Sequence, residues 1–268
     1  MRLPESIPLM GYIPGETFLH RLDPRVKLVA FVLVSAGALL ANTAAGVALA
    51  AGLLICLAGI CSAGWRIWLA GLLRFAWMLG IVAVVNVVFN ASGRPVFLGG
   101  RELPFSVEGL QSAGILTFRV AALIVASMVL MFTTTPTELT RGLQRLAAPL
   151  KRLGVPCDEI ALIVVLALRF IPMLQEELLT TIDAQKARGI DLGAGGLVFR
   201  AGSLVSVLVP ALIGALRRGD LLAVAMAARG YRPGIPRSEY RPLRCTHVDV
   251  IALACSILFF LCQMLVFR

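Results

Sequence analysis

Five runs of mostly apolar residues, each close to twenty residues long, constrain this sequence more than any other feature. They lie at about 26–42, 44–62, 68–91, 109–133 and 248–267. A helix needs roughly 20 apolar residues to cross the hydrocarbon core of a bilayer, so each run predicts one membrane-spanning helix. The composition agrees, because 59% of the residues are hydrophobic and only 15% are charged, beyond the usual range of soluble globular proteins. We therefore expect an all-α integral membrane protein with about five transmembrane helices.

The charged residues predict how these helices are oriented. Arg21, Arg25 and Lys27 abut the start of the first run, and the positive-inside rule then places the N-terminus in the cytoplasm. The loop 92–108 is rich in Gly and Pro around Val96-Phe97-Leu98, which predicts an external hairpin or loop. A net charge of +10 in a soluble protein would suggest a nucleic acid partner. Here the basic residues lie between apolar runs, as in multi-pass proteins of the prokaryotic inner (plasma) membrane, so we expect no nucleic acid partner.

The chain divides into three parts by composition. Residues 1–135 hold the N-terminal segment and the first four predicted transmembrane helices, and 246–268 hold the last one. Between them, residues 136–245 contain fifteen Lys and Arg against nine Asp and Glu. This part is predicted to be a basic, mostly helical cytoplasmic domain.

The cytoplasmic domain opens with an amphipathic helix, predicted over Thr137–Leu153 with a bend at Pro149. Its leucines recur every three or four residues and form one apolar stripe. They are Leu139, Leu143, Leu146, Leu150 and Leu153. Such a helix either lies on the membrane surface or packs against the other helices of the domain, and plain helix packing is at least as well supported.

Two arms then repeat one pattern, at 158–189 and 200–230. Each arm has an apolar segment, a proline (Pro172 or Pro210), an amphipathic segment and a terminal Ala-Arg-Gly. The two tripeptides are Ala187, Arg188, Gly189 and Ala228, Arg229, Gly230. A proline inside a helical pattern kinks the helix or divides it. The segments from proline to arginine, sixteen and nineteen residues, would reach roughly 24 to 29 Å as helix.

The Ala-Arg-Gly endings have two interpretations. Arg in a last helical turn followed by Gly is the ordinary signal that ends a helix, and one occurrence would need no other explanation. Its repetition at corresponding ends of two arms favours a shared recognition role. Because small neighbours allow close approach and a guanidinium binds a carboxylate with two hydrogen bonds, we expect the partner surface to be acidic.

Some charged residues have environments that the sequence leaves open. Arg119 lies within the fourth apolar run, where its cost in lipid predicts that it reaches the membrane surface, faces the helix bundle or marks a coupling site. Glu176 and Glu177 follow Pro172. One of them could pair with a basic residue of the other arm, although a solvated face is favoured.

Several kinds of functional site are missing from the sequence. It contains no G-x-x-x-x-G-K-[ST] loop for ATP, no His, Cys or Asp cluster with metal-ligand spacing, and no acidic pair within an apolar run that would act as a proton relay. The six cysteines form no CxxC pair. We therefore expect no catalytic residues, no cofactor, no metal and no disulfide.

Nearly the whole chain resembles a known family. The segments that carry the likeness are Ile7–Gly15, Leu19–Leu28, Thr135–Leu139, Leu168–Pro172 and the two Ala-Arg-Gly endings. They resemble the transmembrane scaffold, or EcfT-type T component, of energy-coupling factor (ECF) vitamin transporters. The paired tripeptides, in this order, are the most specific part of the likeness.

The resemblance implies an ABC-type importer with two cytoplasmic ATPases, a membrane S component that binds a vitamin, and this chain as the non-catalytic scaffold between them. In that family the arginine-centred tripeptides end coupling helices and dock in grooves of the ATPases. Carried over, Arg188 and Arg229 would be the docking residues, flanked by Ala187, Gly189, Ala228 and Gly230. The S component would rest on the apolar surfaces of the arms.

Three alternatives stay open. The nearest is a dedicated T component of a cobalt, nickel or biotin transporter. A polytopic membrane enzyme would need convergent acids or a metal site in residues 136–245. A proton-coupled carrier should show internal repeats across its spans and a buried carboxylate, whereas the repeat here lies in the cytoplasmic domain.

Overall fold

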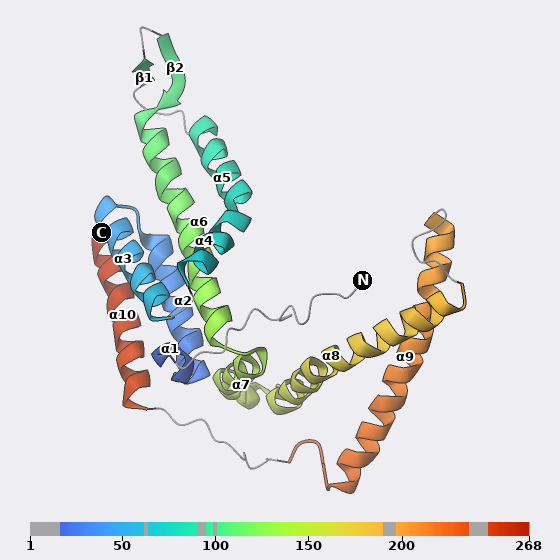
Figure 1. Ribbon diagram of the computed structural model, residues 1–268. Coiled ribbons are helices and arrows are strands. Elements are labelled where there is room, and N and C mark those ends of the chain that lie inside the picture. Colours follow the sequence, from blue (N-terminus) through green and yellow to red (C-terminus); the bar gives the residue numbers. More distant parts are fainter. Residues whose placement is uncertain are drawn as a thin grey trace. The chain divides into compact units, whose positions relative to one another are not determined.

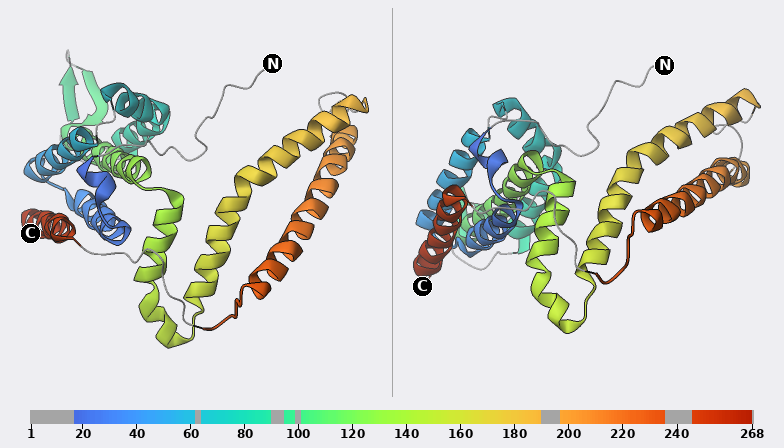
Figure 2. Two further views of the ribbon diagram at one scale, coloured as in Figure 1. Left: turned by 60° about the horizontal axis from the view of Figure 1, so that its bottom comes forward. Right: turned by 90° about the horizontal axis from the view of Figure 1, so that it is seen from below.

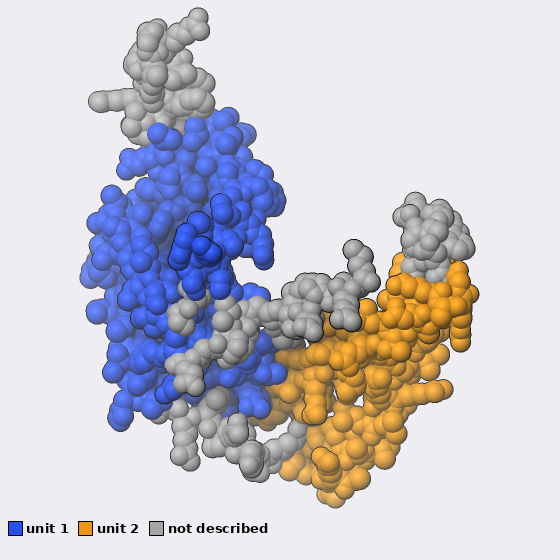
Figure 3. All heavy atoms as spheres, viewed as in Figure 1, with its two compact units in different colours: residues 1–146, 242–268 blue, residues 147–241 orange. Residues whose placement is uncertain are grey.

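The computed structural model describes most of the chain and divides it into two compact units (Figure 3). The described residues are 17–61, 64–89, 95–98, 101–189, 197–235 and 246–267. Unit 1 comprises Met1–Leu146 and Pro242–Arg268, and unit 2 comprises Ala147–Arg241. The N-terminal motif Ile7–Gly15 lies outside the described residues.

Unit 1 is a bundle of helices with one small hairpin, as Figure 1 shows. Its helices are α1 (Phe18–Arg21), α2 (Pro24–Leu40), α3 (Ala44–Ile60), α4 (Trp65–Arg74), α5 (Ala76–Phe89), α6 (Val107–Thr133), α7 (Pro136–Leu146) and α10 (His247–Phe267). Every predicted apolar run falls on one or two of these helices. The expected class, an all-α membrane protein, is confirmed.

The helices differ in how well they match the thickness of a bilayer. Among the described residues, Gly109–Thr133 and His247–Val266 are long and apolar enough to cross alone. The pair α4 and α5 qualifies only as one bent span, with an angle of 54° at the break. The helices α2 and α3 have 17 residues each and would cover about 26 Å at 1.5 Å per residue. The number of crossings therefore stays a prediction.

The core of unit 1 is built from small residues. One buried cluster joins Val34 and Ala38 of α2, Leu54 of α3, and Ala122 and Ala126 of α6. Small side chains let helix backbones approach closely, which is how helices associate in lipid, where burial of apolar surface gives little net gain. Large apolar side chains face outward instead, such as Ile55, which is 71% exposed.

A second buried cluster of unit 1 contains the aromatic pair Trp68 and Phe132. Their ring centroids lie 5.5 Å apart at an interplanar angle of 72°, an edge-to-face arrangement that aromatic pairs prefer. Leu19, Cys61 and Val129 complete the cluster. It fixes α4 against the last turn of α6.

Two strands form the predicted hairpin of the loop 92–108. Strand β1 (Pro95–Leu98) pairs antiparallel with β2 (Arg101–Ser106). Phe97 faces Glu102 and Leu98 faces Arg101 in the register. The hairpin is confirmed, whereas its external location stays a prediction.

Arg119 faces the bundle, one of the three environments that its position allowed. Its guanidinium donates to the carbonyl of Ala41 from Nε at 3.3 Å and from Nη2 at 3.2 Å. It also donates to the side-chain carbonyl of Asn42. These contacts place a cation at the C-terminal end of α2, where the helix dipole favours one.

Unit 2 contains a 3₁₀ helix, η1 (Ala148–Leu153), and the long helices α8 (Cys157–Ala187) and α9 (Leu197–Ala228). In both views of Figure 2, α8 and α9 meet at one end and diverge toward the other. Pro172 and Pro210 lie inside helices that continue past them, so neither proline divides its helix. The predicted bends at these prolines stay predictions.

The prediction of one continuous helix over Thr137–Leu153 was wrong. The α-helical part ends at Leu146, and the chain tightens into η1, which holds Pro149 near its start and ends at Gly154 with φ of 84°. A proline in a helix interior removes one hydrogen bond and its ring clashes with the carbonyl four residues earlier. The α-helix therefore stops before Pro149 instead of bending through it.

A charged contact joins α8 and α9 partway along their length. Arg218 Nη1 lies 2.8 Å from Glu177 Oε2, so Glu177 is an ion-pair partner and not the solvated residue that we favoured. A Cβ built on Gly214 would come within 2.4 Å of Glu177 Oε1. The glycine thus gives the carboxylate room to reach Arg218, one helical turn further on.

Candidate functional site

The two Ala-Arg-Gly tripeptides end α8 and α9 with the same backbone geometry. In each, the arginine N–H donates to the carbonyls four and three residues earlier, at 3.3 and 3.1 Å for Arg188 and at 3.2 and 3.1 Å for Arg229. The glycine N–H donates to the carbonyl three residues earlier at 2.9 Å in both. Each arginine is therefore the last residue held by its helix, and each glycine is the first beyond it.

Both glycines adopt the left-handed conformation, with φ of 84° at Gly189 and 76° at Gly230. This is the glycine-capped helix end that the ordinary stop signal predicts. A Cβ built on either glycine would meet nothing within 4 Å. The backbone angle therefore explains the glycines within this chain, and the space beside them is open to a partner.

The arginine side chains themselves have no structural role that the described residues reveal. Arg188 and Arg229 are exposed, and within the described part of the chain neither guanidinium has an ion-pair or hydrogen-bond partner. By contrast, Arg218 of α9 pairs with Glu177. Capping thus accounts for the glycines but leaves both guanidinium groups available for an external ligand.

The structure does not bring the two tripeptides together. Arg188 follows the end of α8, just before the segment that leads to α9, whereas Arg229 follows the far end of α9. The 32 residues of α9 span about 48 Å at 1.5 Å per residue. The tripeptides are two separate ends, with Pro172 and Pro210 inside the helices that carry them.

Substitution of the capping glycines tests whether the left-handed backbone conformation is the reason for glycine at these two positions. We expect Gly189→Ala and Gly230→Ala each to cost about 1 kcal/mol of stability, because a left-handed conformation strains any residue with a Cβ. Thermal unfolding of the purified chain in detergent, followed by the helical circular dichroism signal, measures the change. Gly219→Ala is the control, since Gly219 lies within α9 with nothing within 4 Å of its built Cβ. It should gain about 1 kcal/mol from helix propensity, and a loss equal to that of the cap variants would contradict the assignment.

A second constellation lies in unit 1, where the ends of several helices meet. We call Asp23, Lys27, Thr133 and Asp249 the polar anchor. Lys27 Nζ donates to the carbonyls of Thr133 at 2.8 Å and His20 at 3.1 Å. Asp249 Oδ1 accepts the backbone N–H of Asp23 at 2.8 Å. All four residues of the anchor are buried.

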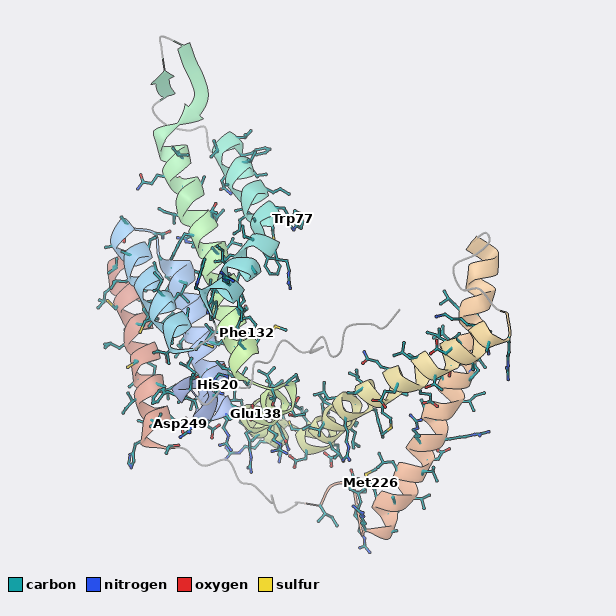
Figure 4. The ribbon with its side chains drawn as sticks, in the orientation of Figure 1. His20, Trp77, Phe132, Glu138, Met226 and Asp249 are labelled. Atoms are coloured by element: carbon teal, nitrogen blue, oxygen red, sulfur yellow. The ribbon has the colours of Figure 1, made fainter. Side chains whose placement is uncertain are left out.

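The polar anchor fixes α10 and the C-terminal end of α6 to the start of α2. Figure 4 shows Asp249 and Glu138 with His20 at one end of unit 1. The negative charges of Glu138, Asp249 and Asp23 attract the positive charge of Lys27. Glu138 accepts the N–H of Thr135 at 3.1 Å, and Thr135 Oγ1 accepts the N–H of Glu138 at 3.3 Å. This reciprocal capping box begins α7.

Sequence reasoning missed most of the polar anchor. Lys27 was used only to predict orientation and, with Asp23, as part of a family-like segment, and Asp249 was not singled out. A usable signal was present, because Lys27 and Asp249 are charged residues at the edges of apolar runs. A charge there is costly unless it has a partner.

The described residues near the helix ends and the polar anchor do not meet the requirements of a metal site. Among the residues that the structure describes, no group of three or more His, Cys, Asp or Glu is arranged to hold a metal ion. The hydrogen bonds of the polar anchor hold helix ends together.

Comparison with known proteins assigns the chain to a family. Residues 15–240 match the family model of cobalt transport proteins, CbiQ. The energy-coupling factor transporter transmembrane protein EcfT of Brevibacillus brevis is 37% identical over 254 residues, covering 95% of this chain and 96% of that protein.

Two further relatives of the same name agree over almost their whole length. EcfT of Heliobacterium modesticaldum is 39% identical over 260 residues, covering 96% of each chain. EcfT of Bacillus subtilis is 35% identical over 263 residues, covering 96% of this chain and 98% of that one. Both arms lie within the residues that the family model matches, and the chain therefore belongs to the EcfT family, the transmembrane T components of energy-coupling factor transporters.

Proposed function

We propose that this T component links ATP hydrolysis by two non-identical cytoplasmic ABC-type ATPases to movement of a membrane S component that binds a vitamin or another micronutrient. The observation that carries the proposal is the pair of exposed, identically capped helix ends at Arg188 and Arg229. Each presents a guanidinium with open space beside it. Two ends about one helix length apart suit two partners better than one.

The apolar faces of unit 2 support a membrane partner. Several large aliphatic side chains of α8 and α9 are 62% to 71% exposed, namely Ile163, Leu212, Leu216, Leu221 and Val224. Exposed apolar surface of this kind marks a site for a protein or a membrane. We assign it to the S component and to the lipid bilayer around it.

The family and the charges support a cellular placement. The relatives are bacterial transmembrane proteins, and we place this chain in the prokaryotic inner (plasma) membrane as a multi-pass protein. The basic residues Arg21, Arg25 and Lys27 then favour a cytoplasmic N-terminus. In this placement unit 2 faces the ATPases, and the chain itself is non-catalytic.

The substrate has one competing assignment. The matching family model is described as a cobalt transport protein, which favours a dedicated T component for a metal or for biotin. The relatives at 35% to 39% identity carry the general ECF name, which favours the vitamin assignment. Two adjacent ATPase genes without an S-component gene would indicate a T component shared by many S components.

Purification of the assembled transporter tests the proposal. We expect a tagged chain, expressed with its own genome's ABC ATPases, to retain both of them and an S component, and the complex in proteoliposomes to accumulate a B vitamin only with ATP. Co²⁺ and Ni²⁺ serve as the competing substrates. ATP hydrolysis by the chain alone, or its recovery without any ATPase, would contradict the proposal.

A further inference from the structure

The hydrogen bonds of α9 contain one defect that its sequence imposes. Pro210 lies in the helix interior and has no N–H, so it cannot donate to the carbonyl of Ser206, four residues earlier. A buried carbonyl that loses its donor costs roughly 1 to 3 kcal/mol unless another group replaces it. The residue that donates to the Ser206 carbonyl in place of position 210 therefore stabilises α9 at the proline.

The replacement donor comes from the other arm. Gln185 Nε2 of α8 donates to the carbonyl of Ser206 at 3.2 Å, and Gln185 is only 8% exposed. Val207 and Ala211, on either side of the proline site, are also buried. The contact is thus a partly buried hydrogen bond with two buried apolar side chains beside it.

Gln185 stands three residues before Arg188, within the last turn of α8. The corresponding residue of the other arm, three before Arg229, is Met226, which lies near the end of α9 in Figure 4. A thioether cannot donate a hydrogen bond. The two arm ends therefore share their caps, but a side-chain amide ties the Arg188 end to the proline site of the opposite helix.

We propose that Gln185 is a positioning residue that holds the Arg188 end of α8 to the proline site of α9. A change in α9 around Pro210 is then transmitted to the Arg188 end of α8 through this side chain, whereas it reaches the Arg229 end only along α9 itself. This inference rests on the proposed function only where it concerns docking. The tie itself is a property of unit 2 alone.

Hydrogen exchange measured by mass spectrometry on the chain alone, in nanodiscs of phosphatidylethanolamine and phosphatidylglycerol, tests the tie. Gln185→Met keeps the length of the side chain but removes the donor, and it should speed exchange in the last turns of α8 about fivefold. Pro210→Ala returns an N–H donor to Ser206. In that background Gln185→Met should have little effect.

Pro172→Ala is the matched control, because it restores a donor in α8, away from Gln185. The effect of Gln185→Met should persist there at about fivefold. Equal effects of Gln185→Met in the native and Pro210→Ala backgrounds would overturn the tie. No ATPase is present in this experiment, so its outcome is independent of the proposed docking.

A second measurement tests positioning in the complex with both ATPases. Gln185→Met should weaken ATPase binding about fivefold when the Arg229 end is disabled by Arg229→Ala. It should have no further effect in Arg188→Ala, where the end that it positions is already lost. The same loss in both backgrounds would indicate general damage to unit 2 and would overturn positioning, whereas ATPase binding indifferent to both arginines would overturn the docking proposal and leave the exchange result standing.

Discussion

Arg188→Ala combined with Arg229→Ala should detach both ATPases from the chain and abolish ATP-driven uptake. A charged hydrogen-bonded contact contributes about 2 kcal/mol, or about thirtyfold in affinity, and its loss at both ends leaves each partner without its anchor. Both side chains are exposed and lie beyond the last helical residue. The substitutions should therefore leave folding unchanged. Co-purification and vitamin uptake in proteoliposomes measure the result.

The controls for this prediction come from the same helices. Arg217→Ala removes an exposed arginine of α9 that lies outside both tripeptides, and it should leave assembly intact. Arg188→Lys and Arg229→Lys retain the charge but lose the planar fork, so they should recover only part of the affinity. Normal assembly and uptake by the double alanine variant would disprove docking through these residues.

Asp249→Ala should cause the largest loss of stability in unit 1, about 3 kcal/mol. The carboxylate accepts the backbone N–H groups of Asp23 at 2.8 Å and Thr246 at 2.7 Å, and Asp249 is 1% exposed. Alanine leaves these donors without an acceptor and removes a countercharge of Lys27. The apparent Tm of the purified chain in detergent and its yield in membranes measure the effect.

Two comparisons give this second prediction its specificity. Asp249→Asn retains one acceptor oxygen and should lose less than alanine does. Asp220→Ala, an exposed carboxylate of α9, should change the apparent Tm little. If Asp249→Ala behaved like Asp220→Ala, the polar anchor would have no structural importance.

Local signals explain why much of the fold could be predicted. Apolar runs of bilayer length placed the helices of unit 1, and glycines and prolines placed the hairpin between β1 and β2. The repeated Ala-Arg-Gly placed both helix ends, because capping depends on residues within one turn. Asp158 and Glu159 are in the first turn of α8, where the helix dipole favours acidic residues.

Contacts between distant segments could not be predicted in the same way. The ion pair between Glu177 and Arg218 depends on the register of α8 against α9, which no single-helix pattern specifies. The hydrogen bond of Asp249 spans 226 positions of the chain. The break between α4 and α5 falls at Phe75, where neither Pro nor Gly marks it.

The antiparallel course of α8 and α9 has a consequence for symmetry. Two antiparallel helices are interchanged, to a first approximation, by a twofold rotation about an axis perpendicular to the pair. That rotation carries the end at Arg188 toward the end at Arg229. Most homo-oligomers also assemble about twofold axes, so the two repeated arms of this single chain would offer equivalent ends to the two related ATPases that we propose. The glycine caps of the two ends are equivalent under this rotation. The residues three positions before the arginines, Gln185 and Met226, are not equivalent.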